Sequence, residues 1–162
     1  MRCTSHLCAI AMSLWPVVIA GIQTPAANTL PAPLRAHVNE DRFEVVTSIR
    51  GLPLGVREEL QTLFRSTSLD IAEPGAAFRA TDVILEPNLP TRRLVMAACS
   101  IDHCMVYYER GGIAHTWHVT LFHWTPAATR FEWGGIAPGG LRTIDELRKA
   151  ALSGAIRASG SW

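Results

Sequence analysis

Along residues 78–133, short runs of strand-forming residues follow one another, and the first of them alternates loosely between apolar and polar residues. Five runs in this region, separated by short turn-forming segments, are FRATDVIL, RRLVMAAC, CMVYYER, IAHTWHVTLFHW and TRFEW. Their β-branched and aromatic residues favour strands. An earlier run, RFEVVTSI at residues 42–49, has the same character. The pattern therefore predicts a sheet of about four to six strands.

Two other segments have apolar residues at helical spacing. We expect an amphipathic helix over residues 53–65 and a C-terminal helix over residues 144–153. Thr143 and Glu146 have the three-residue spacing of a capping box, and Gly154 is suited to ending the second helix. The apolar stripes of the two helices are Val56, Leu60, Leu63 and Phe64, and Leu147, Ala150 and Ala151.

The order of these elements is strand, helix, strands, helix. Sequential strands with short connections favour an antiparallel meander, and amphipathic helices need an apolar sheet face to cover their stripes. We therefore predict an α+β fold, in which an antiparallel β-meander packs with one helix before the meander and one C-terminal helix.

The N-terminal segment has the three-part layout of a secretory signal. Arg2 precedes an uncharged apolar run at residues 7–22, and small residues and prolines follow. This run contains Pro16 and is short for a membrane span of about 20 residues. We expect cleavage near Ala26 or Ala27 and a periplasmic or secreted product; the alternative is an uncleaved membrane anchor.

The predicted organisation of the chain follows from that signal. Residues 1–27 are a signal peptide, residues 28–41 are an irregular lead-in with two prolines, and residues 42–162 are a single α+β domain.

Composition disfavours several classes of partner. Of the 162 residues, 48% are hydrophobic and 18% are charged, which is typical of one globular domain. The formal net charge of +1 provides no strong field to attract nucleic acid or an anionic membrane. We therefore expect no nucleic-acid partner, and contact with a membrane only through the signal segment. Fourteen arginines against one lysine, Lys149, indicate a bacterial origin with a GC-rich genome.

Export changes how the four cysteines are interpreted. Cleavage would remove Cys3 and Cys8, which leaves Cys99 and Cys104 as a pair. In an oxidising compartment, this pair is expected to form a disulfide. The disulfide would close a hairpin around the loop SIDH.

The turns in residues 99–124 determine which side chains share a sheet face. The disulfide-closed hairpin would place Ala97 opposite Val106 and Val95 opposite Tyr108. A two-residue turn at the glycine pair 111–112 would place Tyr108 opposite His115. One face would then be covered by the helices, and a one-residue slip would exchange the faces. The other face would carry the candidate binding residues Tyr107, His118, Phe122 and Trp124.

The histidines and cysteines of this region suggest metal binding, but their spacing argues against it. His115 and His123 share a strand face yet lie about 26 Å apart at 3.3 Å per residue. A zinc site at Cys99, His103 and Cys104 lacks a recognisable fourth ligand and competes with the disulfide. We therefore expect no metal site and no cofactor.

The sequence favours binding over catalysis. It contains no nucleophile elbow, zinc-protease motif or phosphate-binding glycine loop. We predict a noncatalytic binding or interaction protein of the bacterial envelope, inhibitor- or immunity-like, whose sheet face contacts a protein or a small apolar ligand. The alternative is a small secreted enzyme that uses His118 or His115 as its general acid or base.

Overall fold

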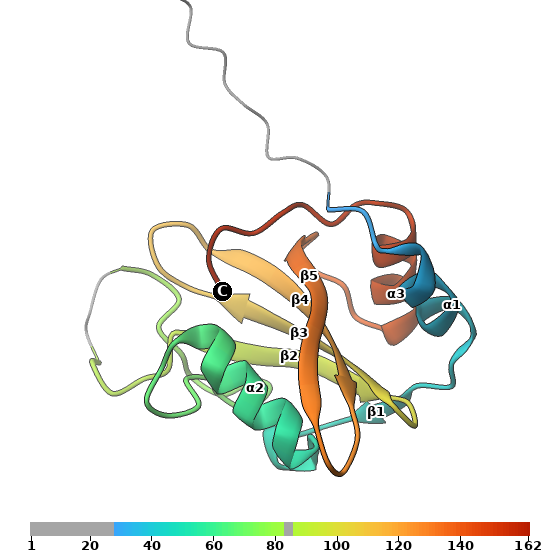
Figure 1. Ribbon diagram of the computed structural model, residues 1–162. Coiled ribbons are helices and arrows are strands. Elements are labelled where there is room, and N and C mark those ends of the chain that lie inside the picture. Colours follow the sequence, from blue (N-terminus) through green and yellow to red (C-terminus); the bar gives the residue numbers. More distant parts are fainter. Residues whose placement is uncertain (1–27, 83–85) are drawn as a thin grey trace, which may run out of the picture.

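The computed structural model describes residues 28–82 and 86–162. The predicted signal peptide, residues 1–27, lies outside the described residues. A five-stranded antiparallel sheet in the order β1-β2-β3-β4-β5 forms the centre of the fold (Figure 1). The elements are, in chain order, α1 (Ala32–Glu40), β1 (Glu44–Val46), η1 (Ile49–Gly51), α2 (Leu54–Phe64), β2 (Arg92–Cys99), β3 (His103–Arg110), β4 (Thr116–Trp124), β5 (Thr129–Ala137) and α3 (Ile144–Leu152).

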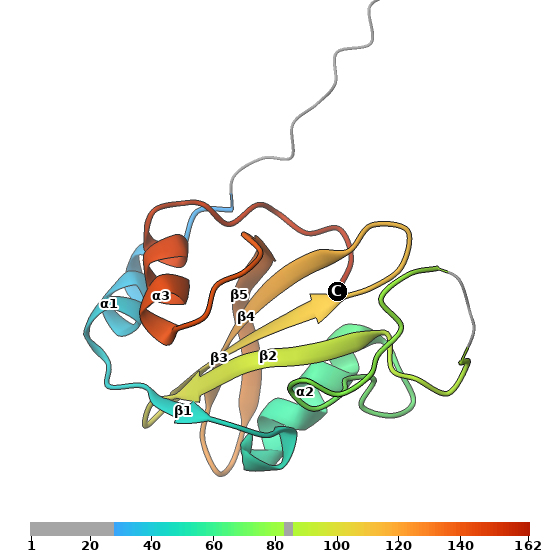
Figure 2. The ribbon, with the colours of Figure 1, turned by 180° about the vertical axis from the view of Figure 1, so that it is seen from behind.

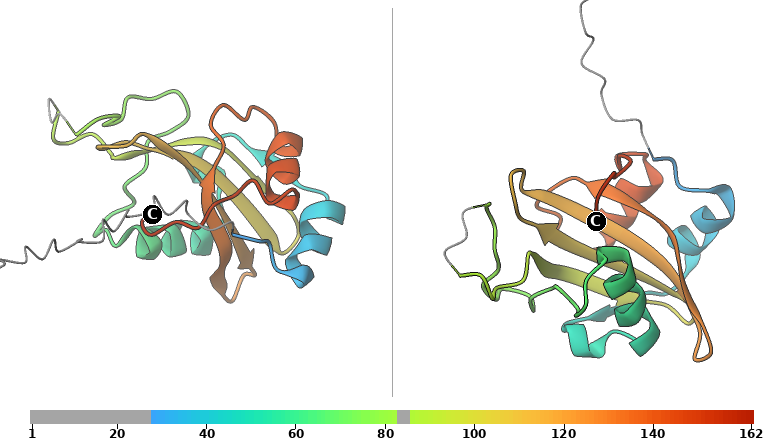
Figure 3. Two further views of the ribbon diagram at one scale, coloured as in Figure 1. Left: turned by 90° about the horizontal axis from the view of Figure 1, so that it is seen from above. Right: turned by 60° about the vertical axis from the view of Figure 1, so that its left-hand side comes forward.

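Helices cover both faces of the sheet. On one face, α1 and α3 pack around the alternate β3 residues Met105 and Tyr107. On the other face, α2 packs around Val106 and Tyr108. Figures 1 and 2 show the two helical layers from front and back, and Figure 3 shows the sheet between them. Each face therefore has its own hydrophobic core.

The predicted α+β class and both predicted helices are confirmed. Helix α2 begins after Pro53 and buries Val56, Leu60 and Phe64. Helix α3 begins after Thr143, whose side-chain oxygen accepts a hydrogen bond from the Glu146 N–H at 3.2 Å. Both helices follow from local sequence because the spacing of their apolar residues and the cap are local signals.

The structure differs from the expected irregular lead-in, because residues 32–40 form α1. Prolines occupy its N-terminal end, where the missing N–H costs no helical hydrogen bond. Leu34 and Val38, four residues apart, are buried on one side of α1. The Arg148 Nε on α3 donates to the Val38 carbonyl at 2.6 Å, at the C-terminal end of α1. Tertiary contacts thus stabilise a helix whose own sequence signal is weak.

The strand predictions are partly confirmed. Residues 78–82 of the expected strand at residues 78–85 form no strand, and residues 83–85 lie outside the described part of the chain. The expected strand TRFEW extends into the glycine-rich segment that follows it and forms β5. Gly134 lies against the Val119 carbonyl, where a Cβ would overlap it. The glycine-rich segment therefore pairs closely with β4.

The first hairpin has the expected register near its turn. Cys99 pairs with Cys104, the two are joined by a disulfide, and Ala97 pairs with Val106. Further along, a β-bulge between Leu94 and Met96 shifts the register, so Leu94, rather than Val95, lies opposite Tyr108.

The second hairpin differs from the expected two-residue turn. Arg110 pairs with Thr116, so a five-residue connection joins the strands, and Tyr108 lies opposite His118 instead of His115. Gly111 is held by its N–H, which donates to the Thr91 carbonyl at 2.9 Å. A tertiary contact therefore overrides the local turn preference. The odd shift of three residues exchanges the faces of β4 relative to β3.

No helix within residues 28–82 and 86–162 is both long and apolar enough to cross a membrane.

Candidate functional site

The four residues expected on one open face lie in the two cores. Tyr107 belongs to the core under α1 and α3, whereas Phe122 and Trp124 belong to the core under α2. His118 stacks on Tyr108 with ring centroids 5.3 Å apart, which places it on the α2 side as well. Trp124 is the one of the four that keeps partial exposure. The structure thus places three of the residues on the α2 side of the sheet and Tyr107 on the other side.

Tyr107 is held as a structural residue. Its hydroxyl donates to the Pro138 carbonyl at 2.7 Å. Burial raises the pKa of Tyr107 to about 12, so this phenol stays protonated at physiological pH. The hydrogen bond links β3 to the segment between β5 and α3.

His118 lines a cavity, and within the described residues no carboxylate is hydrogen-bonded to its ring. The cavity has a volume of about 470 Å³, and Thr116 Oγ1 lies 2.9 Å from His118 Nε2. The other ring nitrogen, Nδ1, is buried with no hydrogen-bond partner in the described part of the chain. Burial first, and then the charges of Arg110 and Arg92, together lower the pKa of His118 to about 4. The imidazole is therefore neutral near pH 7, and the Thr116 hydroxyl, rather than a carboxylate, is hydrogen-bonded to its ring.

His115, in contrast, has a carboxylate partner but does not line the cavity. Its Nε2 lies 2.9 Å from Glu109 Oε2, and its ring stacks on Trp117 with centroids 4.5 Å apart. Arg93 Nε also donates to Glu109, at 2.8 Å. His115 does not line the cavity that contains His118. Asp82 also lines the cavity that contains His118, but no hydrogen bond joins the two side chains within the described residues. Neither histidine therefore combines a cavity with a carboxylate hydrogen-bonded to its ring, the arrangement typical of a general acid or base.

A groove between α2 and the β4–β5 turn is a candidate binding site. Its volume is about 510 Å³, within the range of ligand sites in proteins. Trp124 and Leu54 contribute apolar surface, and Leu54 is 61% exposed. The charged side chains that line it are both acidic, Glu58 and Glu59. The groove therefore combines apolar walls with negative charge.

At one end of this groove, α2 packs closely against the start of β5. A Cβ on Gly55 would overlap Thr129 Oγ1 and lie 3.0 Å from Thr129 Cβ, so only glycine allows α2 to approach β5 this closely. In the turn, the Thr125 N–H donates to the Ala128 carbonyl at 2.8 Å, and the Ala128 N–H donates to Thr125 Oγ1 at 3.1 Å. Both walls are thus built from rigid elements.

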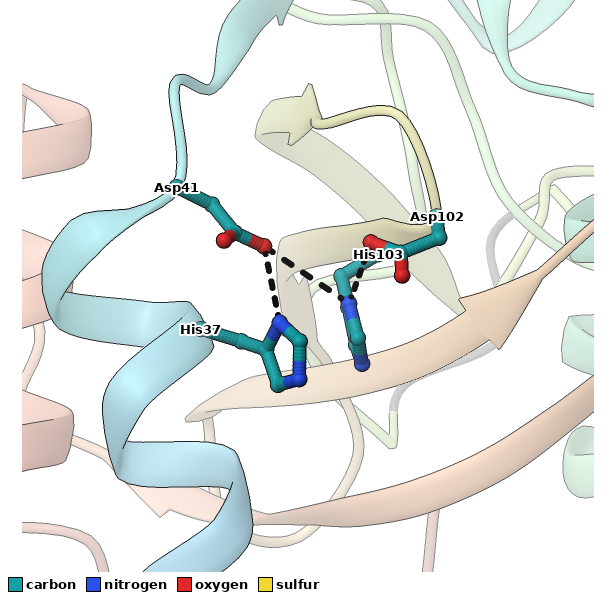
Figure 4. Close-up of side chains that lie close together, drawn as sticks. All are labelled: His37, Asp41, Asp102 and His103. Carbon is teal, nitrogen blue, oxygen red and sulfur yellow. Dashed lines mark hydrogen bonds and ion pairs between the residues drawn. The ribbon is translucent and has the colours of Figure 1, made fainter.

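A cluster of two histidines and two aspartates lies where the end of α1 meets the β2–β3 turn (Figure 4). His37 Nδ1 lies 3.2 Å from Asp41 Oδ2. His103 Nδ1 lies 2.8 Å from Asp102 Oδ1 and 3.7 Å from Asp41 Oδ2. One potential ligand atom from each of the four residues lies within 4.8 Å of the others. These residues could hold a metal ion.

Hydrogen bonds make this corner rigid. Ser100 Oγ donates to Asp41 Oδ2 at 3.2 Å and accepts from the His103 N–H at 3.0 Å. The Trp124 N–H donates to the Asp102 carbonyl at 2.8 Å. Burial raises the pKa of Asp102, but the hydrogen bond from His103 and the nearby histidines lower it more, so its net pKa lies below the ordinary value. The Asp102 carboxylate is therefore ionised near pH 7.

This cluster was not predicted from the sequence. The two local pairs are visible in the sequence, His37 and Asp41 at a helical i,i+4 spacing and Asp102 next to His103. No local pattern joins the pairs, because about 60 residues separate them. Predicting the cluster would have required knowing that residues 32–40 form a helix, because a helix places His37 and Asp41 on the same side.

A scan against protein-family models, a search of curated proteins and a search of solved structures each found no significant match to the chain.

Proposed function

We propose that this protein is exported by its N-terminal signal segment and acts as a noncatalytic binding protein of the bacterial envelope, inhibitor- or immunity-like. Its partner is a protein that inserts a segment into the groove between α2 and the β4–β5 turn. The observation that carries the proposal is the groove itself, with a volume of about 510 Å³ and Trp124 in its wall. Aromatic residues in such grooves are common anchors of protein interfaces.

The chemistry of the groove favours a segment with an apolar and a basic side chain. Within residues 28–82 and 86–162, Leu54 is one of four large hydrophobic residues that are highly exposed, and it lines this groove. An apolar side chain of the partner would cover Leu54 and remove its surface from water. Glu58 and Glu59 would attract a lysine or arginine beside it. Because the acidic residues lie at the surface, this attraction should weaken as salt increases.

The geometry gives less support to the alternative, a small secreted enzyme that uses His118 or His115. His118 lines a cavity with Asp82, but among the residues that the structure describes its ring is hydrogen-bonded only to the Thr116 hydroxyl. His115 has the Glu109 carboxylate but lies outside that cavity. A binding protein needs neither a general base nor a nucleophile. The surroundings of His118 and His115 are therefore compatible with a binding role.

A matched pair of variants tests the proposal. Leu54 is 61% exposed in the groove and Val45 is 62% exposed on β1, outside it. The purified protein is used to capture partners from the envelope fraction, in parallel with Leu54→Arg and Val45→Arg. We expect one captured protein to be lost with Leu54→Arg, to be kept with Val45→Arg, and to bind more weakly in high salt or with the double variant Glu58→Gln, Glu59→Gln.

One outcome would refute the proposal that the groove is the binding surface. If every captured protein is retained equally by wild-type protein, Leu54→Arg and Val45→Arg, the groove is not the binding surface. Circular dichroism of each variant checks that the exposed substitution has left the fold intact.

A further inference from the structure

The imidazole–carboxylate cluster lies outside the groove and has the donor set of a metal centre. Its four potential ligands come from two parts of the chain. His37 lies on α1 and Asp41 caps its C-terminal end, whereas Asp102 lies in the β2–β3 turn and His103 begins β3. We propose that these four residues bind one divalent transition-metal ion of the zinc type. This proposal does not depend on the proposed partner groove.

The spacing of the ligand atoms fits a single four-coordinate ion. Metal–ligand distances of about 2.0–2.2 Å imply about 3.4 Å between neighbouring ligands of a tetrahedral ion. In the cluster, the nitrogen–oxygen distances are 3.2 Å for His37–Asp41, 3.7 Å for His103–Asp41 and 2.8 Å for His103–Asp102. Because every atom lies within 4.8 Å of the others, small side-chain rotations bring all four around one point.

The charge of the cluster also favours a divalent cation. The three carboxylates of Asp41, Asp102 and Glu132 contribute −3, and Arg130, which donates to Glu132 at 2.7 Å, contributes +1. With neutral imidazoles the group therefore carries a charge of −2. A divalent cation neutralises this charge, and mixed imidazole and carboxylate ligands suit zinc and its neighbours better than magnesium or calcium.

Glu132 occupies the position of a partner that orients a metal-binding histidine. His103 Nδ1 faces the aspartates, while its Nε2 lies 3.4 Å from Glu132 Oε2. That carboxylate oxygen is buried and has no hydrogen-bond partner in the described part of the chain. On metal binding, the ring proton of a neutral His103 would reside on Nε2 and be donated to Glu132, leaving the Nδ1 lone pair for the ion. Carboxylate–histidine–metal arrangements of this kind are a common feature of zinc sites.

The site is both held in place and open to solvent. The Cys99–Cys104 disulfide closes the turn that carries Asp102 and His103. The His103 side chain is 3% exposed, whereas those of His37 and Asp102 are 40% and 36% exposed. An ion can thus enter past the two exposed ligands and meet a buried histidine that needs little reorganisation.

Titration of the purified, oxidised protein with Zn²⁺ and Co²⁺ tests the inference. We expect one Zn²⁺ per chain by calorimetry, and a strong visible absorption of bound Co²⁺ that indicates a four-coordinate site. The double variant His37→Gln, Asp102→Asn should lose both signals. Glu132→Gln should retain the stoichiometry but weaken binding about 10–100-fold, as expected for an orienting residue.

The control is His115→Gln, which changes another partly exposed histidine paired with a carboxylate. It should leave Zn²⁺ binding unchanged, and Leu54→Arg in the groove should as well. Absence of stoichiometric Zn²⁺ binding to wild-type protein, or unchanged binding in the folded double variant, would overturn the metal site. Neither result would affect the partner-capture experiment, so the two proposals can fail separately.

Discussion

Acidification should destabilise this protein through His118. The residue is 1% exposed, and its pKa is about 4 because burial disfavours the imidazolium, with Arg110 and Arg92 adding repulsion. In the unfolded chain, the pKa returns to the ordinary value of 6.5. As the pH falls from 6.5 to about 4, the unfolded state binds a proton that the folded state does not, so folding stability is lost in that window.

The magnitude follows from the two pKa values. The difference between 6.5 and about 4, at 1.36 kcal/mol per pKa unit, corresponds to about 3 kcal/mol once the pH is below both values. At about pH 4.5 most of this penalty, about 2.5 kcal/mol, is already present. This loss is a large fraction of the 5–15 kcal/mol that typically stabilises a domain.

Urea unfolding of wild-type protein and His118→Gln between about pH 7 and pH 4.5 measures this effect. Glutamine does not titrate and can still hydrogen-bond Thr116, whose hydroxyl now lies 2.9 Å from the His118 ring. Carboxylates titrate in both proteins and cancel in the comparison. We expect the wild type to lose about 2.5 kcal/mol more than the variant. Parallel losses in the two proteins, or a His118 NMR titration near pH 6.5, would refute the reasoning.

Two further predictions concern the hairpins. In Gly111→Ala, the new Cβ would overlap the Arg79 carbonyl and lie 2.7 Å from Ala80 Cα, so stability should fall by about 1–3 kcal/mol. Gly160→Ala, which meets nothing within 4 Å, should leave thermal unfolding unchanged, and equal effects of the two changes would contradict this argument. Intact-mass measurement of unreduced protein should show the Cys99–Cys104 disulfide as a loss of two hydrogens, and Cys99→Ser with Cys104→Ser should lower stability by about 2 kcal/mol. Free thiols in correctly exported protein would contradict that prediction.

Elements with strong local signals were predictable from sequence. Helix α3 follows from the Thr143–Glu146 cap and an apolar stripe, and α2 from the stripe that includes Leu60. Helix α1 was not predictable in this way, because only Leu34 and Val38 are buried along it and much of its support comes from α3. Local propensity is decisive only where tertiary contacts do not outweigh it.

The candidate sites were less predictable than the elements. The first hairpin has the expected register at its disulfide. The second hairpin is shifted, because the Gly111 N–H donates a hydrogen bond to the Thr91 carbonyl and a five-residue connection replaces the expected two-residue turn. Since side chains alternate along a strand, that shift moves His118 to the face of Tyr108 and away from Tyr107. An error confined to one turn therefore changes the residues assigned to a whole face.

The α+β class, the meander, two helices and the pairing of Cys99 with Cys104 could be predicted from the sequence, because each depends on residues close together in the chain. The folded structure was needed to show that helices cover both sheet faces, that the groove lies beside Trp124, and that α1 brings His37 to His103. These arrangements join segments far apart in sequence. Their formation depends on packing and register over the whole fold, which no local pattern specifies.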